Sequence, residues 1–491
     1  MYNIYITKVK NIRPAENADR LNLCEVFGNT TVVDKSVNEE DLYLYLPTDG
    51  QISVEFGEAN NLFRKKDDAG NNIGGFVDPV KRNISAIRLR GNKSDGLVLP
   101  LSSLSSFGDI SGLKEGDIVT VFNGHVIAEK YIPRRPDPSR ARSAGNKTRK
   151  HKTPTAPLFA EHADTEQLPY NLSAFKAGDE IEITLKMHGT SQRTGYLPVL
   201  VGYKDSLFRR IANKVIMGLK VRKDWGEDGR KALYHSLKHG EPVYDWGYVS
   251  GTRRTVLENF EGGYYGDNAF REPHSKMFEG KLNKGETVYY EVVGFTTNGT
   301  PIMSSANNAK LQDKEFIKQY GKETVFSYGC FPTGHTDYDN ITPRSQSDIY
   351  VYRMTMTNED GFVVEYTPDF MRYRCEQMGV KTVPVLWKGI IPHEEEVETG
   401  RVVENDYGGW DEVTEWVGVN AGEWILRKAE EYYDGPDPIG KTHVREGVVV
   451  RILNRPKFSA YKHKNFSFKV LEGIAKVEAT APDMEETKRY P

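Results

Sequence analysis

The sequence has few cysteines and no long apolar run, and both absences limit the kind of protein it can be. Its 491 residues include three cysteines, Cys24, Cys330 and Cys375, odd in number and far apart. This argues against a disulfide framework or a zinc cluster and is typical of a reducing compartment. No apolar run approaches the roughly 18–20 residues of a membrane-spanning helix, and the N-terminus lacks an apolar core of signal length. We therefore expect a cytoplasmic protein with no membrane contact.

The sequence also lacks a strong net charge. Its formal net charge is −3, with 27% charged and 38% hydrophobic residues, so the overall balance indicates no particular partner. Local charge clusters have to supply that information. The length exceeds that of one typical hydrophobic core, so two or more domains are expected.

Residues 1–131 show little helical periodicity. They alternate β-branched or aromatic residues with polar ones in short runs that turn clusters separate, as strands do. A small β-barrel is the natural arrangement for this many short strands, because closure removes exposed edges. The expected strands lie at 30–36, 41–47, 85–91, 95–101 and 117–122.

The stretch 130–153 has a different composition. It holds nine Lys or Arg residues against one acid, Asp137, and it has three prolines. Such a segment cannot bury enough surface to fold alone. Residues 132–157 are therefore assigned as a basic linker, either a solvated hinge or an arm that lies on a polyanion.

The rest of the chain, from 158 to 473, has mixed α and β patterns, and 474–491 form a C-terminal tail. The acidic segment 393–398 is expected to be a solvated loop. Strands are expected at 180–186, 287–295, 349–356, 360–366, 446–453 and 466–471, and helices at 205–222 and 421–433.

One lysine stands out. A run of strand formers ends at Lys186, which enters a turn with His188 and Gly189. A lysine amine attacks an electrophile only when unprotonated, a form that desolvation or neighbouring cations favour. Far downstream, Lys462 and Lys464 point the same way in a predicted strand. Two cations on one face need an anion between them, and a phosphate is the obvious candidate.

Two glutamates occupy apolar strands where an unpaired carboxylate would be costly to bury. Glu291 and Glu446 should each meet a metal, an arginine or a ribose hydroxyl. Arg253 and Arg254 lie upstream of both glutamates, in a strand–turn–strand context. The aromatic strand 349–356 offers a flat surface for a base.

In this order, the motifs resemble the covalent nucleotidyltransferase superfamily of polynucleotide ligases and capping enzymes. "KMHG", which begins at Lys186, matches the K-x-H-G form of the RNA ligase motif whose lysine takes AMP. Residues 1–131, with "NIRPAENADRLNLCEVFG", resemble the N-terminal OB module of the fifth, nick-sealing family of ATP-dependent RNA ligases. The predicted fold is α+β: an OB-like β-barrel that binds nucleic acid, then over 158–473 a mixed α/β, ATP-grasp-like adenylyltransferase domain with antiparallel sheets.

The resemblance implies an enzyme that forms lysyl-AMP from ATP, moves the AMP to a 5′-phosphate end and joins that end to a 3′-OH. The implied substrate is RNA or an RNA/DNA duplex with a nick, bound by a monomer. The implied roles are Lys186 as nucleophile, Lys462 and Lys464 on the α-phosphate, His188 in orienting the site, Gly189 at the nucleotide, Glu446 on Mg²⁺ or Mn²⁺, Glu291 on ribose or metal, Tyr352 on adenine, and Arg253 or Arg254 on ribose or the incoming nucleotide.

Two alternatives stay open at this point. One is an RNA-capping guanylyltransferase; the other is a nucleic-acid-binding OB protein with an inactive transferase domain. Capping enzymes and DNA ligases generally carry an OB domain after the last lysine motif. Only 27 residues follow Lys464 here, too few for a barrel, so an RNA ligase is expected in preference to both. No separate domain for nicotinamide mononucleotide is evident, so ATP is expected in preference to NAD.

Overall fold

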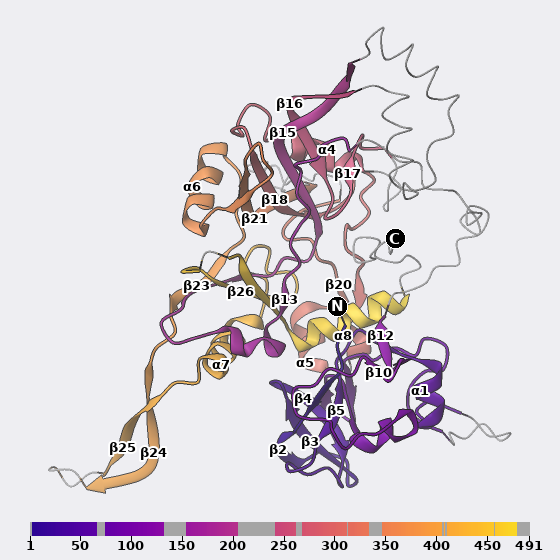
Figure 1. Ribbon diagram of the computed structural model, residues 1–491. Coiled ribbons are helices and arrows are strands. Elements are labelled where there is room, and N and C mark those ends of the chain that lie inside the picture. The colour runs from indigo at the N-terminus through magenta and orange to yellow at the C-terminus, as the bar shows by residue number, and fades with distance from the viewer. Residues whose placement is uncertain are drawn as a thin grey trace.

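The protein has a mixed α+β architecture built from antiparallel sheets (Figure 1). The structure is a computed structural model that describes residues 2–65, 74–131, 154–204, 241–261, 268–311, 313–332, 346–404, 407, 410–455 and 457–478. The helix predicted at 205–222 and the basic stretch 132–153 lie outside these residues. Within them, no helix is both long and apolar enough to cross a membrane.

The N-terminal module, residues 2–131, consists of short strands around a core that includes Ile4, Leu44 and Phe56. Four of its five predicted strands are found at nearly their expected positions, and the fifth is reduced to Val121–Phe122. In the described part of the module the strands form several small sheets, so a closed OB barrel stays a prediction. The sheets are β1 (Tyr5–Thr7), β5 (Tyr43–Leu46) and β9 (Leu97–Pro100); β2 (Lys10–Pro14), β3 (Leu21–Val26) and β4 (Asn29–Asp34); β6 (Gly50–Ile52) and β12 (Ala128–Lys130); β7 (Ile87–Leu89) and β8 (Asn92–Ser94); and β10 (Val121–Phe122) and β11 (His125–Val126), with helix α1 at Val54–Ala59.

A five-stranded central sheet follows in the middle of the molecule. Helix α7 (Ala421–Tyr433), as predicted from the sequence, packs Ile425 and Ala429 against the apolar face of the sheet. In the strand register Leu185 lies opposite Val448, and Gly447 lies opposite Lys464. The end of β14, the start of β26 and the end of β27 therefore meet at one edge. The strand order is β13 (Glu166–Gln167), β27 (Ser459–Lys464), β26 (Gly447–Ile452), β14 (Glu180–Leu185) and β23 (Val385–Ile390).

A six-stranded sheet forms the upper part of Figure 1. Its core contains Val288, Tyr290 and Val351, and Met371 and Cys375 of helix α6 pack against them. Residues 186–189 lead directly from β14 of the central sheet into β15 of this one, so the predicted lysine turn joins the two sheets. The strand order is β17 (Val256–Leu257), β16 (Glu241–Gly251), β15 (Thr190–Lys204), β18 (Glu286–Gly294), β21 (Ser347–Thr357) and β22 (Val363–Glu365), with α4 at Glu272–Lys276 and α6 at Pro368–Met378.

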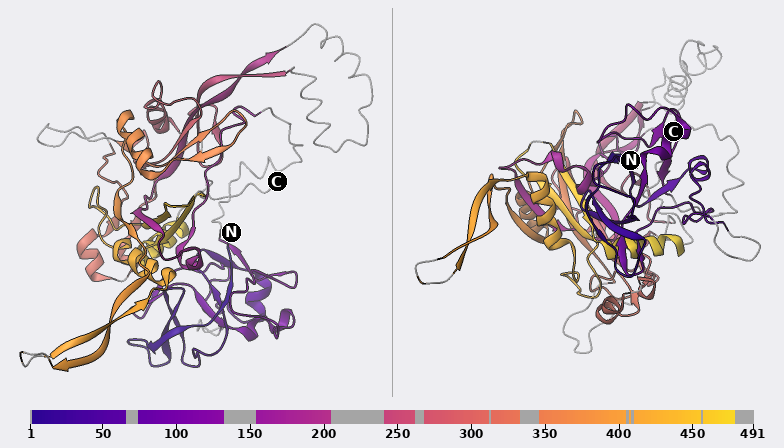
Figure 2. Two further views of the ribbon diagram at one scale, coloured as in Figure 1. Left: turned by 60° about the vertical axis from the view of Figure 1, so that its left-hand side comes forward. Right: turned by 90° about the horizontal axis from the view of Figure 1, so that it is seen from below.

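The strand predicted at 466–471 was wrong, because this segment is the start of helix α8 (Phe466–Glu478). The Asn465 Oδ1 atom accepts a hydrogen bond from the Phe468 N–H at 3.1 Å, as an N-terminal cap does. Phe466 and Leu471 of the helix share a core cluster with Ala86 of the N-terminal module. Helix α8 thus lies between that module and the central sheet (Figures 1 and 2). Nearby elements are β19 (Ala306–Asn307), α5 (Lys314–Tyr320) and β20 (Glu323–Thr324).

The loop predicted at 393–398 was also wrong. These residues begin β24 (Glu394–Glu404), which pairs with β25 (Trp410–Gly418) in a two-stranded ribbon. The ribbon projects away from the rest of the molecule in both figures. Trp410 and Trp416 are each 68% exposed. Because both faces meet solvent, the ribbon lacks the polar–apolar alternation that identifies a strand on a core.

Candidate active site

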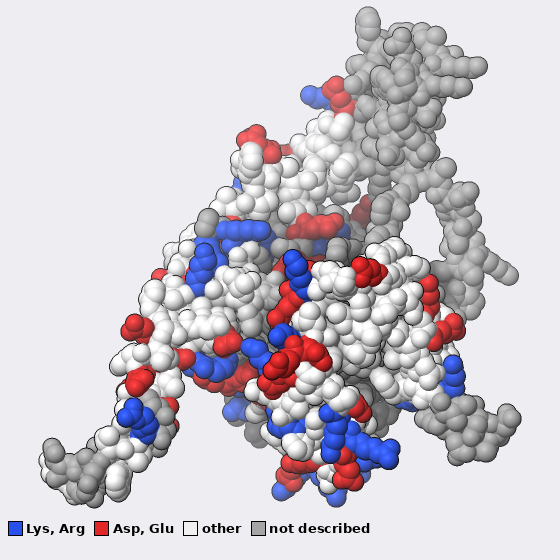
Figure 3. Space-filling view, turned by 60° about the horizontal axis from the view of Figure 1, so that its bottom comes forward, with Lys and Arg blue, Asp and Glu red and all other residues white. Residues whose placement is uncertain are grey.

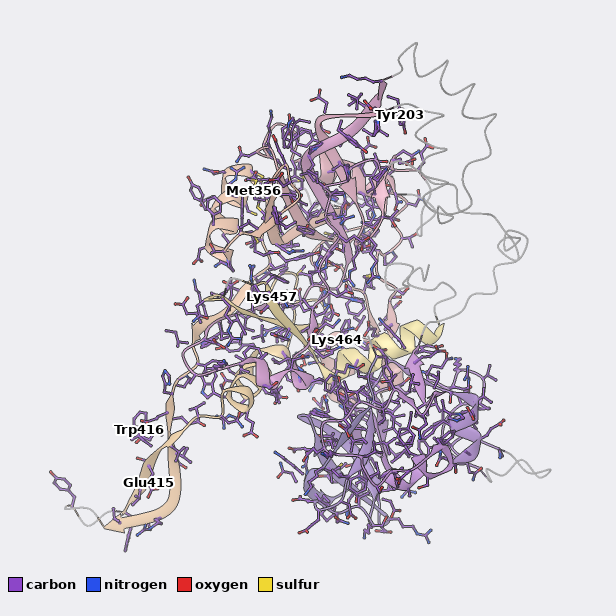
Figure 4. All side chains as sticks on the ribbon, viewed as in Figure 1. Tyr203, Met356, Glu415, Trp416, Lys457 and Lys464 are labelled. Carbon is purple, nitrogen blue, oxygen red and sulfur yellow. The ribbon has the colours of Figure 1, made fainter. Side chains whose placement is uncertain are left out.

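Three predicted site residues meet at the edge of the central sheet. The Lys186 Nζ atom lies 2.7 Å from Glu446 Oε1, and the Lys464 Nζ atom lies 3.5 Å from the same oxygen. The Lys186 N–H donates to the Gly447 carbonyl oxygen at 3.0 Å, which fixes the start of the lysine turn. Figure 4 shows Lys464 where β27 passes into α8.

Gly447 makes this convergence possible. Its φ is +144°, and a Cβ atom there would lie 2.0 Å from the His463 carbonyl oxygen. Any other residue would push β26 away from β27. The glycine that follows Glu446 therefore lets the carboxylate approach Lys464.

His188 lies on the other side of Glu446, with its Nδ1 atom 3.7 Å from Glu446 Oε2. Its ring meets Phe326 and Phe468 edge-to-face, at centroid distances of 4.6 and 4.7 Å. Its backbone N–H donates to the Tyr328 hydroxyl at 2.7 Å. Burial lowers the pKa of His188 to about 4, against the opposing effect of Glu446. The imidazole is therefore neutral at pH 7.

Glu446 is the electrostatic centre of this group and only 2% of its side chain is exposed. Burial acts to raise its pKa, but the charges of Lys186 and Lys464 outweigh burial and the pKa is lowered. The carboxylate is therefore ionised at neutral pH. Its Oε2 atom is buried and has no hydrogen-bond partner among the described residues.

Three further predicted residues lie in the six-stranded sheet or directly before it. A Cβ atom at Gly189 would lie 2.4 Å from the Val292 carbonyl oxygen and 2.9 Å from Glu291 Cγ, so the lysine turn packs directly on Glu291. Ser191, opposite Glu291 in the register, places its Oγ atom 2.9 Å from the Tyr352 hydroxyl. Burial, and then the charge of Glu291, raises the pKa of Tyr352. Gly189, Glu291 and Tyr352 therefore lie together.

His162 connects the remaining predicted residues to this group. Its ring meets that of Tyr352 at a centroid distance of 5.4 Å. Burial lowers the pKa of His162 well below its ordinary range, and the charges of Arg253 and Lys462 lower it further. Arg253 and Lys462 therefore act electrostatically on His162, which lies beside Tyr352. Arg254 pairs with Asp164, with 2.9 Å between Nη2 and Oδ2, and not with the lysines at the edge of the central sheet.

Glu472 of α8 is a site residue that the sequence reasoning missed. Its Oε2 atom lies 2.7 Å from the Lys464 Nζ atom. The strand predicted at 466–471 would have ended before it. His162 also had no predicted role. The sequence signal that could have revealed helix α8, and with it Glu472, was Asn465, a favourable helix cap directly before the apolar run.

The chain has the donor atoms that a nucleotide with a divalent metal requires. No group of three or more His, Cys, Asp or Glu side chains forms a metal cage in the described ranges. Mg²⁺ and Mn²⁺ are commonly held by one or two carboxylates, with water and substrate phosphate as the other ligands. The buried Oε2 atom of Glu446, which has no hydrogen-bond partner among the described residues, fits that type of site.

The comparison with solved structures bears on this arrangement. A mutant of the Naegleria gruberi RNA ligase with AMP and Mn superposes with a TM-score of 0.50 and 16% identity, covering 95% of this chain and 97% of the other. The chain has the fold of that RNA ligase. A mutant with ATP and Mn and a form with PPi of the same ligase give TM-scores of 0.50 at 17% identity, covering 95% of this chain and 98% and 97% of theirs. No protein-family profile and no curated protein sequence matches the chain.

Proposed function

We propose that this protein is an ATP-dependent RNA ligase that forms lysyl-AMP at Lys186 and seals nicks in RNA-containing duplexes. The observation that carries the proposal is the convergence of Lys186 and Lys464 on the buried carboxylate of Glu446. The RNA-ligase fold supports it, and the solved relatives are described with ATP or AMP and Mn.

The proposed reaction has three steps. The Lys186 ammonium gives up a proton to water; its nitrogen then bonds to the α-phosphorus of ATP, and the bond from that phosphorus to the bridging oxygen breaks to release pyrophosphate. A 5′-phosphate oxygen then takes the AMP as the phosphorus–nitrogen bond breaks. The 3′-OH attacks the activated 5′-phosphate, and AMP leaves. Each step is a phosphoryl transfer, in which positioning and charge neutralisation dominate catalysis.

The side chains around Lys186 have separate tasks in this proposal. Glu446 Oε1 is the carboxylate oxygen next to the Lys186 Nζ atom and directs it. Lys464 and Lys462 neutralise the α-phosphate. Tyr352 stacks on adenine, with Arg253 beside it and Glu291 on the ribose or the metal. Glu446, through Oε2, and Glu291 would hold Mg²⁺ or Mn²⁺, which when bound neutralises phosphate charge.

The N-terminal module and the basic stretch are proposed to hold the polynucleotide. Lys and Arg side chains are interspersed with Asp and Glu on the face in Figure 3, so the described residues of this face form no broad surface of one sign. The proposal therefore assigns most phosphate contacts to residues 132–153, by their composition. Action as a cytoplasmic monomer remains a prediction.

The deciding experiment incubates the protein with α-labelled ATP and Mg²⁺ or Mn²⁺, followed by denaturing electrophoresis. The wild type should carry label, whereas Lys186→Ala should not, because it has no amine. Lys186→Arg should not carry label either, because a guanidinium stays protonated. Lys428→Ala is the control, since Lys428 of α7 contacts Glu431, Trp387 and Trp424, none of which is a residue of the candidate site. Label from GTP instead of ATP would indicate a capping enzyme. A labelled Lys186→Ala protein would refute the assignment.

A further inference from the structure

Helix α8 touches the candidate active site with one face. The Phe468 ring packs against His188 and lies under the Lys464 ammonium, 5.6 Å from the ring centroid. Glu472, one turn further along, reaches the same ammonium. Residues four apart share a helix face, so this face presents one aromatic ring and one carboxylate to the site.

The neighbouring face of α8 is fixed to the N-terminal module. The Lys469 ammonium donates to Asn29 Oδ1 at 3.2 Å and to Asp95 Oδ2, and Asp95 is only 5% exposed. Lys93 lies over the Phe466 ring at 5.5 Å from its centroid. These contacts restrain the rotation and translation of α8. The position of Glu472 is therefore set by the fold and not by its own side chain alone.

Lys464 consequently lies between two carboxylates. Glu446 Oε1 is 3.5 Å away and Glu472 Oε2 is 2.7 Å away, and the lysine side chain is 11% exposed. Glu446 also contacts Lys186 at 2.7 Å, so its single negative charge is divided between two ammonium groups. Glu472 supplies the second negative charge. A phosphate that approaches Lys464 must share it with Glu472, and negative groups at such a distance repel.

We propose that Glu472 is a positioning residue that holds the Lys464 ammonium beside Glu446 before the nucleotide binds and competes with the nucleotide phosphate for it. This inference rests on the proposed ligase function. The Glu472 carboxylate then has two opposite effects on the reaction with ATP. Glu472 weakens ATP binding through its charge, and it raises the rate of lysyl-AMP formation because it orders the lysine that neutralises the α-phosphate.

The two effects predict an unusual kinetic result for Glu472→Gln, which keeps the shape and removes the charge. The ATP concentration for half-maximal labelling should fall about threefold or more, while the maximal rate of lysyl-AMP formation falls about tenfold. Glu472→Asp keeps the charge on a side chain that is one methylene shorter. Its half-saturating ATP concentration should therefore be close to that of the wild type, while its maximal rate of lysyl-AMP formation should stay low. A purely structural residue would lower the amount of folded protein without lowering the half-saturating concentration.

The matched control is Glu431→Gln. Glu431 pairs with Lys428 at 2.8 Å on α7, a similar lysine–carboxylate contact with no site residue in it. This variant should leave both kinetic values unchanged. If Glu472→Gln raises the half-saturating ATP concentration, or leaves both values unchanged, the inference is overturned.

A measurement without nucleotide distinguishes this inference from the proposed function. Brief treatment of the full chain with an amine-acylating reagent, read by mass spectrometry, reports how firmly each ammonium is held. Glu472→Gln should raise acylation of Lys464 several-fold, and Glu431→Gln should do so for Lys428 only. If the wild type takes no label from ATP but Lys464 becomes reactive, the ligase proposal fails and the hold on Lys464 stands. If labelling is normal and Lys464 reactivity does not change, the inference fails alone.

Discussion

Neutralising Glu446 should destabilise the protein as well as stop its reaction. Glu446→Gln leaves the ammonium groups of Lys186 and Lys464 without the carboxylate that they share. At an effective dielectric constant of 20, unit charges 4 Å apart attract by about 4 kcal/mol, and desolvation offsets part of this. Removing one partner of a buried pair costs about 3–5 kcal/mol. Lys186 is 21% exposed and Lys464 keeps Glu472, so both cations are partly relieved. We therefore expect the lower end, about 3 kcal/mol.

The assay is a double-mutant cycle in unfolding free energy. Glu446→Gln, Lys186→Met and the double variant are compared with the wild type by urea denaturation without nucleotide. The double variant loses the pair together and leaves no lone charge between these two residues. It should therefore be more stable than the sum of the single costs predicts, by about 1–3 kcal/mol. Glu431→Gln, an exposed carboxylate, should change stability by about 0.5 kcal/mol or less.

Strictly additive costs would refute this reasoning, because they would mean that the 2.7 Å contact carries no net energy. A Glu446→Gln protein as stable as the wild type would refute it as well. Both results would move Glu446 from a charge centre of the fold to a residue that acts only on bound nucleotide.

Three other predictions follow from the described contacts. Gly189→Ala should abolish labelling by ATP, because its Cβ atom would overlap the Val292 carbonyl oxygen, whereas Gly202→Ala in the strand β15 that follows, with nothing within 4 Å, should label normally. Tyr352→Phe, which loses only the contact with Ser191, should keep its ATP dependence, whereas Tyr352→Ala should need about tenfold more ATP if the ring stacks on adenine. His274 donates to or accepts from the Ser347 hydroxyl at 2.8 Å, and burial lowers its pKa from 6.5 to about 4. The unfolded chain binds the proton first, so up to about 3 kcal/mol of stability should be lost as the pH falls from 6.5 to 4; His274→Gln should flatten this part of the pH profile of unfolding, and an unchanged profile would contradict it.

The strand-borne part of the site was predictable from local sequence. Lys186 comes directly after one apolar strand, and Glu446 comes directly before another. The alternation and composition of these strands predict them well, and glycines mark the close approaches beside them. Helix α7 was predicted at its observed bounds from the pattern of its residues, and the structure shows that Asn420 caps it. These features depend on residues that are neighbours in the sequence.

The parts that could not be predicted depend on contacts between distant segments. Phe466, Phe468 and Val470 alternate as in a strand, but they enter separate core clusters that only the folded chain brings to α8. The Asn465 cap competes with that alternation and prevails. Glu472 meets Lys464 only because the segment is helical. The pairing of β24 with β25 could not be predicted, because neither face of the ribbon packs on a core and its sequence therefore lacks the alternation typical of a buried strand.

The ribbon of β24 and β25 has a consequence for behaviour at high protein concentration. A two-stranded sheet has two outer edges whose backbone groups can template pairing with another chain, and Trp410, Trp416 and Val402 add exposed apolar surface to it. The acids along both strands, among them Glu394, Glu396 and Glu415, repel an identical ribbon. High salt screens this repulsion and leaves the apolar attraction in place. The ribbon is therefore where colloidal aggregation of the protein should begin as ionic strength rises.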